Sequence, residues 1–400
     1  MAENVKNSIN ETESSKIVLF IVLSQFCCTS LWFAGNAVIN DLVINFKLSA
    51  SALGHLTSAV QFGFITGTLI FALLTIADRF SPSKVFLTCA LIGAFINLGV
   101  LLPSNNLWSL VAVRFGTGFF LAGIYPVGMK IAADHYEKGL GKSLGFLVGA
   151  LVLGTAFPHF IKSFISLTAW KSVIIGTTTL ATTGGVLMAL FVPDGPFRKA
   201  GQQLDISAFF RVFKNLNFRT AAFGYFGHMW ELYTFWAFVP FILMAYNTAH
   251  PDSVMNVPLL SFLIIGIGGP ACVIGGYLAQ RFGTKNIATL ALGLSCFCCL
   301  LSPLILTANS SLVLMGFLLF WGVMVIADSP LFSTLAAQNA DANIKGTALT
   351  IVNCIGFAIT IVSIQLVSLL QNLIDIQYLF LALAIGPVLG LMALTKKNAV

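Results

Sequence analysis

Long apolar runs, separated by short polar segments, occupy most of this 400-residue chain. A helix that crosses a bilayer needs about 20 predominantly apolar residues, and twelve runs come near or exceed that length. The pattern therefore predicts twelve transmembrane helices. In chain order they are Ile17 to Ile39, Ser51 to Ile76, Val85 to Leu102, Leu107 to Lys130, Ser143 to Ile165, Ser172 to Val192, Thr220 to Tyr246, Leu259 to Ala279, Ile287 to Thr307, Ser311 to Leu335, Thr347 to Leu370 and Ile376 to Thr395.

The composition supports a lipid environment. Hydrophobic residues make up 58% of the chain and charged residues only 9%, and a water-soluble domain of that composition would expose large apolar patches. The runs leave no segment for a second, soluble domain, and we find neither a catalytic cluster nor a glycine-rich phosphate loop with its lysine. We therefore expect no enzyme, no ATP-driven pump and no cofactor. The eight cysteines lie in or beside apolar runs and are expected to pack as small apolar side chains.

Lysine and arginine lie mainly on one side of the predicted membrane. With the N-terminus inside, seventeen of the 21 are cytoplasmic, Lys47, Lys162 and Lys171 fall outside, and Arg114 lies within a span. The positive-inside rule thus predicts a multi-pass protein of the cell (inner or plasma) membrane with cytoplasmic N- and C-termini. It also explains the net charge of +7 without a nucleic-acid partner. The first apolar run is too long for a signal-peptide core and is expected to be a retained helix.

A polar segment from Pro193 to Phe218 divides the spans into two sets of six. Phe209, Phe210 and Phe213 alternate there with basic residues, which is typical of an amphipathic segment on an anionic leaflet or docked on the bundle. We predict an N-terminal bundle over residues 1–192, a cytoplasmic linker over 193–218 and a C-terminal bundle over 219–400.

The two halves are similar to each other, which indicates an internal repeat. Ala77-Asp78-Arg79-Phe80 after the second span matches Ala279-Gln280-Arg281-Phe282 after the eighth. At nearly the same offset, Ala122 to Pro126 matches Ile326 to Pro330. The sequence therefore predicts an all-α membrane protein with twelve transmembrane helices in two pseudo-symmetric six-helix bundles.

These segments resemble those of the major facilitator superfamily. Gly276 to Lys285, with Arg281, is similar to the family's G-x-L-a-D-R-x-G-r-k loop, and Asp78, Arg79 and Lys84 belong to the first-half copy. Arg114-Phe115 with Gly118 resembles the R-f-x-x-G motif of helix four, which is associated with proton coupling in that family. The resemblance implies a monomer that works by alternating access, in which Asp78, Arg79, Lys84, Arg281 and Lys285 help gate the change. It also places helices one, four, seven and ten around a central cavity.

Three ionisable side chains lie well inside spans, where an unpaired charge is costly: Arg114, Glu231 and Asp328. Helical spacing gives each of helices one, four, seven and ten a face of polar or aromatic residues. We therefore expect a substrate site formed by Gln25, Trp32, Asn36, Arg114, Tyr125, His228, Glu231, Trp321 and Asp328.

Depth along the helices suggests how a proton is handled. At about 1.5 Å per residue, Arg114 and Glu231 lie within about 6 Å of each other in depth, whereas Asp328 lies about 13 Å deeper. A carboxylate that is alternately paired with an arginine and released can take up and give up a proton. We expect Glu231 in that role, Asp328 as second choice and His228 as a relay. The alternative is a fixed structural ion pair between Arg114 and Glu231.

The leading interpretation is a proton-coupled secondary transporter of a small neutral, zwitterionic or cationic solute. A multidrug or metabolite/siderophore exporter stays open, although the helix-five motif of drug antiporters is absent. Less favoured are an anion transporter of the nitrate and cyanate kind, since spans two and eight lack arginine, and a divalent-metal transporter using His228, Glu231 and Asp328. We also expect bends at Gly266 to Pro270 and at Gly123 to Pro126.

Overall fold

The computed structural model describes residues 2–49, 51–135, 140–164, 169–198, 211–252 and 254–395. Those residues form helices and connecting turns, with no strand among them. The first half contains α1 (Ala2–Thr29), α2 (Ala34–Ala37), α3 (Ile39–Phe46), α4 (Ala52–Leu73), α5 (Ile76–Arg79), α6 (Pro82–Leu98), α7 (Leu107–Leu121), α8 (Tyr125–His135), α9 (Leu140–Ser163) and α10 (Lys171–Phe191).

The second half begins with the longest helix of the described chain. It contains α12 (Leu216–Ala249), α13 (Val257–Gly266), α14 (Gly268–Phe282), α15 (Thr284–Ile305), α16 (Ser311–Ala327), α17 (Ser329–Asn339), α18 (Lys345–Leu370), α19 (Ile376–Leu379) and α20 (Ile385–Thr395). Asn215 starts α12, because its side chain accepts hydrogen bonds from the backbone N–H groups of Asn217 and Phe218. Of the linker residues Phe209, Phe210 and Phe213, only Phe213 lies in the described part, where its ring contacts Phe218 and Phe226.

Eleven helical segments in the described chain are long and apolar enough to cross a membrane. The first predicted span differs from the rest: its apolar helix, Lys16–Thr29, is shorter. The chain then turns through residues 30–33 before α2 and α3 continue it. The twelve-span pattern is thus present, with its first span interrupted. The interruption was not expected from the apolar pattern.

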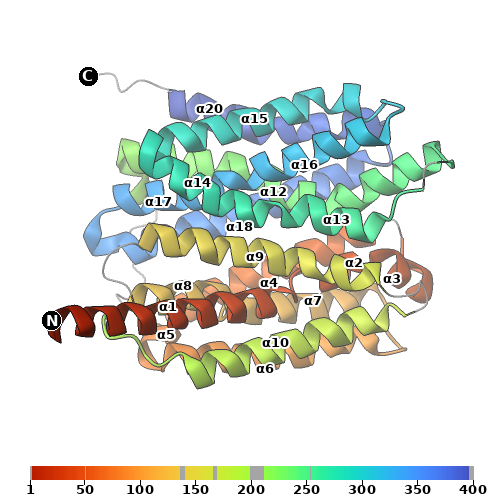
Figure 1. The fold of residues 1–400 in the computed structure, drawn as a ribbon. Helices are drawn as coiled ribbons and strands as arrows, with labels where there is room; N and C mark the ends of the chain where they lie inside the picture. Colours follow the sequence, from red (N-terminus) through yellow and green to blue (C-terminus); the bar gives the residue numbers. More distant parts are fainter. Residues whose placement is uncertain are drawn as a thin grey trace.

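The helices lie in two groups, with the first half below and the second half above in Figure 1. Helix α4 packs against α18, and α9 packs against α13 and α14, so these three helix pairs join the groups. We call them the N-terminal and C-terminal bundles. We call the side where α1 begins and α20 ends the terminal face (left in Figure 1), and the opposite side the distal face.

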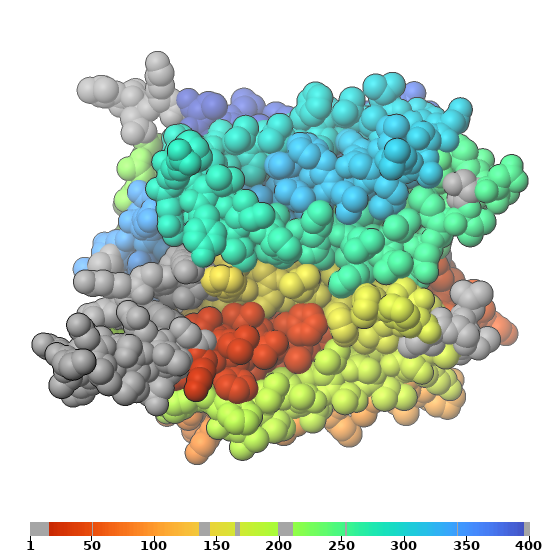
Figure 2. All heavy atoms as spheres, viewed as in Figure 1, coloured from red at the N-terminus to blue at the C-terminus, as the bar shows by residue number. Residues whose placement is uncertain are grey.

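Large apolar side chains remain exposed around the molecule, among them Phe95, Leu190 and Leu312. In Figure 2 the visible face is continuous across both bundles, where α9 meets α13 and α14. Exposed apolar surface of this extent is stable in lipid and not in water. The protein is therefore a multi-pass membrane protein.

Breaks in the helices occur where the halves match in sequence. The fourth span bends at residues 122–124, between α7 and α8, and the tenth bends at Asp328, between α16 and α17. The eighth span bends at Ile267, between α13 and α14. The bends expected at Gly123 to Pro126 and at Gly266 to Pro270 are therefore confirmed. The bend at Asp328 places a carboxylate directly at the interruption of a helix.

Candidate functional site

Arg114 holds the break in the first span together. Its Nη2 atom donates to the carbonyl oxygens of Leu31, at 3.1 Å, and Trp32, and Nη1 donates to Asn97 Oδ1 at 3.4 Å. Only 1% of the residue is exposed. The carbonyl groups at a helix end carry partial negative charge. The turn after α1 therefore places partial negative charge beside the buried, positively charged guanidinium. The alternative of a fixed ion pair between Arg114 and Glu231 is therefore wrong: within the described residues, Arg114 binds backbone and amide oxygens.

Glu231 lies inside the C-terminal bundle instead. Its Oε1 atom accepts hydrogen bonds from Ser295 Oγ at 2.5 Å, Trp321 Nε1 at 2.6 Å and Cys299 Sγ at 3.2 Å. These donors come from α15 and α16, and Glu231 is 1% exposed. Three donors on one oxygen stabilise a buried carboxylate without a basic partner. Glu231 and Trp321, both expected in the substrate site, thus contact each other within one bundle.

His228 and Asp328 form a pair that the sequence did not assign. His228 Nδ1 lies 2.7 Å from Asp328 Oδ1, and both side chains are 1% exposed. His228 Nε2 and both carboxylate oxygens of Asp328 have no hydrogen-bond partner among the described residues. The sequence placed Asp328 apart from Arg114 and Glu231 in depth, and its contact here is with His228 instead. Because α12 and α16 run in opposite directions, the pairs Glu231–Trp321 and His228–Asp328 form two successive polar contacts between these helices.

The three side chains considered for a divalent metal do not converge. His228 and Asp328 meet each other, whereas Glu231 is held by α15 and α16. No group of three histidine, cysteine or acidic side chains capable of holding a metal occurs in the described ranges.

Aromatic rings from both bundles meet at the interface. Trp32 stacks on Tyr233 and on Phe357, with ring centroids 5.8 and 5.6 Å apart. Phe64 of α4 packs on Phe357 at 4.5 Å, and Phe33 meets Trp236 edge to face at 6.3 Å. We call these six residues, Trp32, Phe33, Phe64, Tyr233, Trp236 and Phe357, the aromatic cluster.

The remaining expected substrate residues, Gln25, Asn36 and Tyr125, lie in the N-terminal bundle. Asn36 Nδ2 donates to Thr57 Oγ1 at 2.8 Å, and Trp32 Nε1 donates to Gln61 Oε1 at 3.2 Å. Gln25 is fully buried, and neither of its amide atoms has a hydrogen-bond partner within the described chain. Tyr125, at the start of α8, is partly buried and packs against the hydrophobic core. Of the nine expected residues, Trp32 thus makes direct ring contacts across the interface.

Direct side-chain contacts also join the bundles toward the distal face. Gln365 Nε2 donates to Ser58 Oγ at 2.8 Å, and Asn40 Nδ2 lies 2.9 Å from Met244 Sδ. In the same region, Lys162 forms a buried ion pair with Asp41 at 2.9 Å. The two bundles are therefore in contact at the distal ends of α4 and α18.

The loop residues expected to gate the protein lie at the terminal face. Lys130 of α8 bridges Asp78 at 3.1 Å and Asp134 at 3.3 Å. Arg79 Nε donates to Thr75 Oγ1 at 3.0 Å. Arg198 Nη2 donates to the carbonyl oxygens of Asp78 and Phe80. In the second-half loop, Arg281 lies over the ring of Phe282, and Lys285 is exposed, as is Lys84. Only the first-half copy is therefore tied by an ion pair to another helix of the described chain.

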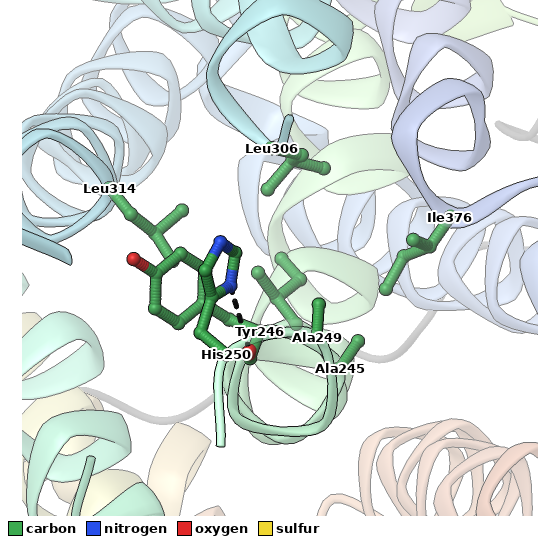
Figure 3. Close-up of a pocket in the computed structure, with 8 residues that line it drawn as sticks. Ala245, Tyr246, Ala249, His250, Leu306, Leu314 and Ile376 are labelled. Atoms are coloured by element: carbon green, nitrogen blue, oxygen red, sulfur yellow. Dashed lines mark hydrogen bonds between the residues drawn. The ribbon is translucent and has the colours of Figure 1, made fainter. Parts of the chain in front are cut away.

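A small cavity of about 80 Å³ lies away from these residues, near the distal end of the C-terminal bundle. It is lined by mainly apolar side chains of α12, α15, α16 and α19, with Tyr246 and His250 at one side (Figure 3). Their rings stack at 4.2 Å, and His250 Nδ1 contacts the Tyr246 carbonyl oxygen at 3.1 Å. The cavity contains none of the ionisable groups discussed above.

Several contact residues were missed by the sequence reasoning. Gln61, Ser295, Cys299 and Phe357 belong to spans two, nine and eleven, from which no candidate was taken. Gln61 is a polar residue within an apolar run, which is a usable signal. Ser295 and Phe357 carry no such signal, because serine and phenylalanine are common in transmembrane helices.

Comparison with known proteins agrees with this architecture. The chain is 26% identical over 187 residues to the putative uncharacterized transporter YgaY of Escherichia coli strain K12. That match spans 45% of this chain and 43% of the relative, less than half the length of either. The nucleoside transporter NupG superposes with a TM-score of 0.72 at 16% identity, covering 95% of this chain and 100% of that one.

Two further solved structures share the fold. The human organic anion transporter MFSD10 gives a TM-score of 0.71 at 15% identity, over 95% of this chain and 99% of that chain. A bacterial homolog of the human lysosomal transporter Spinster, in an inward-facing and unoccupied conformation, gives a TM-score of 0.69 at 14% identity. The match covers 96% of this chain and 94% of that chain. The family model described as Major Facilitator Superfamily matches residues 21–364, and the chain therefore belongs to that superfamily.

Proposed function

We propose that this chain is a proton-coupled secondary transporter that moves a small solute along the interface between its two bundles. The observation that carries the proposal is the buried His228–Asp328 pair at the break between α16 and α17. A carboxylate and an imidazole in contact can share or release one proton. His228 Nε2 and both Asp328 oxygens accept or donate no hydrogen bond within the described chain, so each can bind a proton or a solute group.

The roles of the other charged groups follow from their contacts. Asp328 takes the first place in proton binding and His228 acts with it, whereas Glu231, held by three donors in the C-terminal bundle, is second. Arg114 acts through the α1 break that it holds. The lysine and arginine distribution supports a cell-membrane location with the terminal face in the cytoplasm. We further propose that the transporter works as a monomer.

The similar structures do not indicate one solute. By their names they transport organic anions or nucleosides, and at 14–16% identity they share the fold with this chain. The solute must therefore be inferred from the residues of this chain.

The coupling is tested with purified protein in liposomes. A thermal-stability screen against amino acids, organic acids, nucleosides, siderophores and metal ions identifies a ligand, whose uptake is then driven by an imposed pH gradient. We expect Asp328→Asn to abolish accumulation driven by the gradient while exchange of internal for external solute continues. The matched control is Asp375→Asn, at an exposed position before α19, and it should behave as wild type. Full gradient-driven accumulation by Asp328→Asn would contradict the proposal, and solute-stimulated proton efflux would favour the exporter.

A further inference from the structure

The aromatic cluster contains stacked rings that belong to opposite bundles. Trp32 comes from the turn after α1, whereas Tyr233 and Phe357 come from α12 and α18. In both contacts the ring planes lie 27° apart, with centroids 5.6–5.8 Å apart, as expected of offset stacking. Trp32 is 1% exposed and Phe357 2%. Alternating access moves the bundles relative to each other, so these ring contacts cannot be maintained throughout the transport cycle.

Trp32 is held in place on its own bundle by polar contacts. Its Nε1 donates to Gln61 Oε1 of α4, and its carbonyl oxygen accepts from Arg114 of α7. The indole ring is therefore fixed relative to the N-terminal bundle and moves with it. Tyr233 is likewise packed against Trp236 and Phe357 of the C-terminal bundle, at 5.3 Å in each case.

Two buried donors without partners belong to these rings or contact them. Gln61 Nε2, on the amide that binds the Trp32 indole, and Trp236 Nε1 have no acceptor within the described residues. A buried donor or acceptor without a partner is costly. A ligand that fits here would present a flat ring to the aromatic faces and acceptor groups to the amide and indole N–H donors.

We propose that the solute is an uncharged planar heteroaromatic compound, with a carbonyl or ring-nitrogen acceptor, that inserts between Trp32 and the rings of Tyr233 and Phe357. This inference rests on the proposed transport function and names the chemical class of the solute. The ring of the solute replaces the ring contacts that the bundles lose when they separate. Gln61 Nε2 and Trp236 Nε1 bind its polar edge. A saturated analogue with the same polar groups cannot stack and is a poor ligand.

The test compares matched pairs that differ in ring planarity. Purified protein is titrated with uracil and with dihydrouracil, which keeps both carbonyl and both N–H groups, and with thymine and dihydrothymine as a second pair. Binding is followed by thermal stability and tryptophan fluorescence. We expect at least one planar compound to bind, and to bind about tenfold more tightly than its saturated partner. The proposal is wrong if no planar compound stabilises the protein or if the saturated partners bind equally well.

Variants of Trp32 locate the binding to the aromatic cluster. Trp32→Leu should weaken binding of the planar ligand about tenfold and remove the preference for it over its saturated partner. Trp32→Phe should keep that preference. Trp108→Leu is the matched control, because Trp108 lies at the start of α7 with 77% of its surface exposed. If Trp32→Leu does not fold, Phe357→Leu takes its place with the same expected loss. Unchanged discrimination in these variants would overturn the inference.

The inference and the proposed function fail in different ways. Gradient-driven uptake of a non-aromatic solute would refute the heteroaromatic class and leave proton coupling in place. A different result is binding of planar ligands that depends on Trp32, together with uptake that is independent of the pH gradient. That result would confirm the heteroaromatic class and refute proton coupling.

Discussion

Glu231 illustrates how a single buried carboxylate is stabilised without a cation. Ser295, Cys299 and Trp321 all donate to one of its oxygens. We expect Glu231→Gln to melt near the wild-type temperature, because the amide oxygen still accepts from the indole N–H. Glu231→Ala leaves that N–H and the Ser295 hydroxyl without an acceptor, at a cost of about 1–3 kcal/mol for each buried group. Thermal unfolding in detergent measures the difference, and equal melting of both variants would show that these bonds contribute nothing.

Residue partners were the least predictable part of the site. The positions of Arg114, Glu231 and Asp328 within spans were evident from charge in an apolar run, and all three are buried. Their partners were not evident, because helical spacing gives the face of a residue but not the neighbouring helix. Arg114 in particular binds carbonyl groups that are free only because α1 ends at Thr29. Nothing in the apolar pattern from Ile17 to Ile39 indicates that end.

Among the helix pairs, α4 and α7 pack with almost no space between their backbones. A Cβ atom added to Gly118 would lie 2.0 Å from the Val60 carbonyl oxygen. Gly118→Ala must therefore push the helices apart, and we expect a loss of about 1–3 kcal/mol in stability, seen as a lower melting temperature. Gly293→Ala in α15 is the control, because nothing lies within 4 Å of the added atom. Alanine is the better helix former, so that variant should be neutral or slightly stabilised. A Gly118→Ala protein as stable as Gly293→Ala would contradict the close contact.

The segment between α4 and α6 is tied to α8 by the ion pair of Asp78 and Lys130. Both side chains are 23% exposed, so the pair contributes at most about 1 kcal/mol to stability. We propose that it acts on the rate of the conformational change. Asp78→Asn should change the transport rate several-fold while the melting temperature stays within a degree or two of wild type. Asp252→Asn, at an exposed position of a distal loop, is the control. A variant with normal transport would exclude the pair from gating.

At the scale of elements, the sequence predicted most helices and two of the bends, since glycine and proline mark interrupted helices. The bend at Asp328 was not predicted, because Asp328 was considered only as a charged residue within an apolar run. The repeat did indicate it: Ile124, the residue that aligns with Asp328, lies at the bend between α7 and α8. Applying the internal repeat to backbone geometry would have placed Asp328 at a helix break.

For the whole molecule, the contact between α4 and α18 at the distal face provides a direct test of alternating access. A Cβ atom at Gly54 would lie 2.9 Å from Ser368 Cβ. A disulfide needs about 3.5–4.5 Å between Cβ atoms, so α4 and α18 must move apart slightly to form one. The eight native cysteines are buried and free, so they should not compete for oxidant. Gly54→Cys combined with Ser368→Cys should therefore form a disulfide that joins the two bundles.

The cross-linked protein should stop transporting, because the bundles cannot separate at the distal face, and a reductant should restore transport. Each single variant serves as a control and should be insensitive to oxidant. The measurement is uptake into liposomes before and after reduction, with the cross-link checked by a mobility shift after cleavage of the chain between α4 and α18. Undiminished transport by fully cross-linked protein would mean that the solute crosses without opening this contact. The interface between the bundles would then not be the pathway.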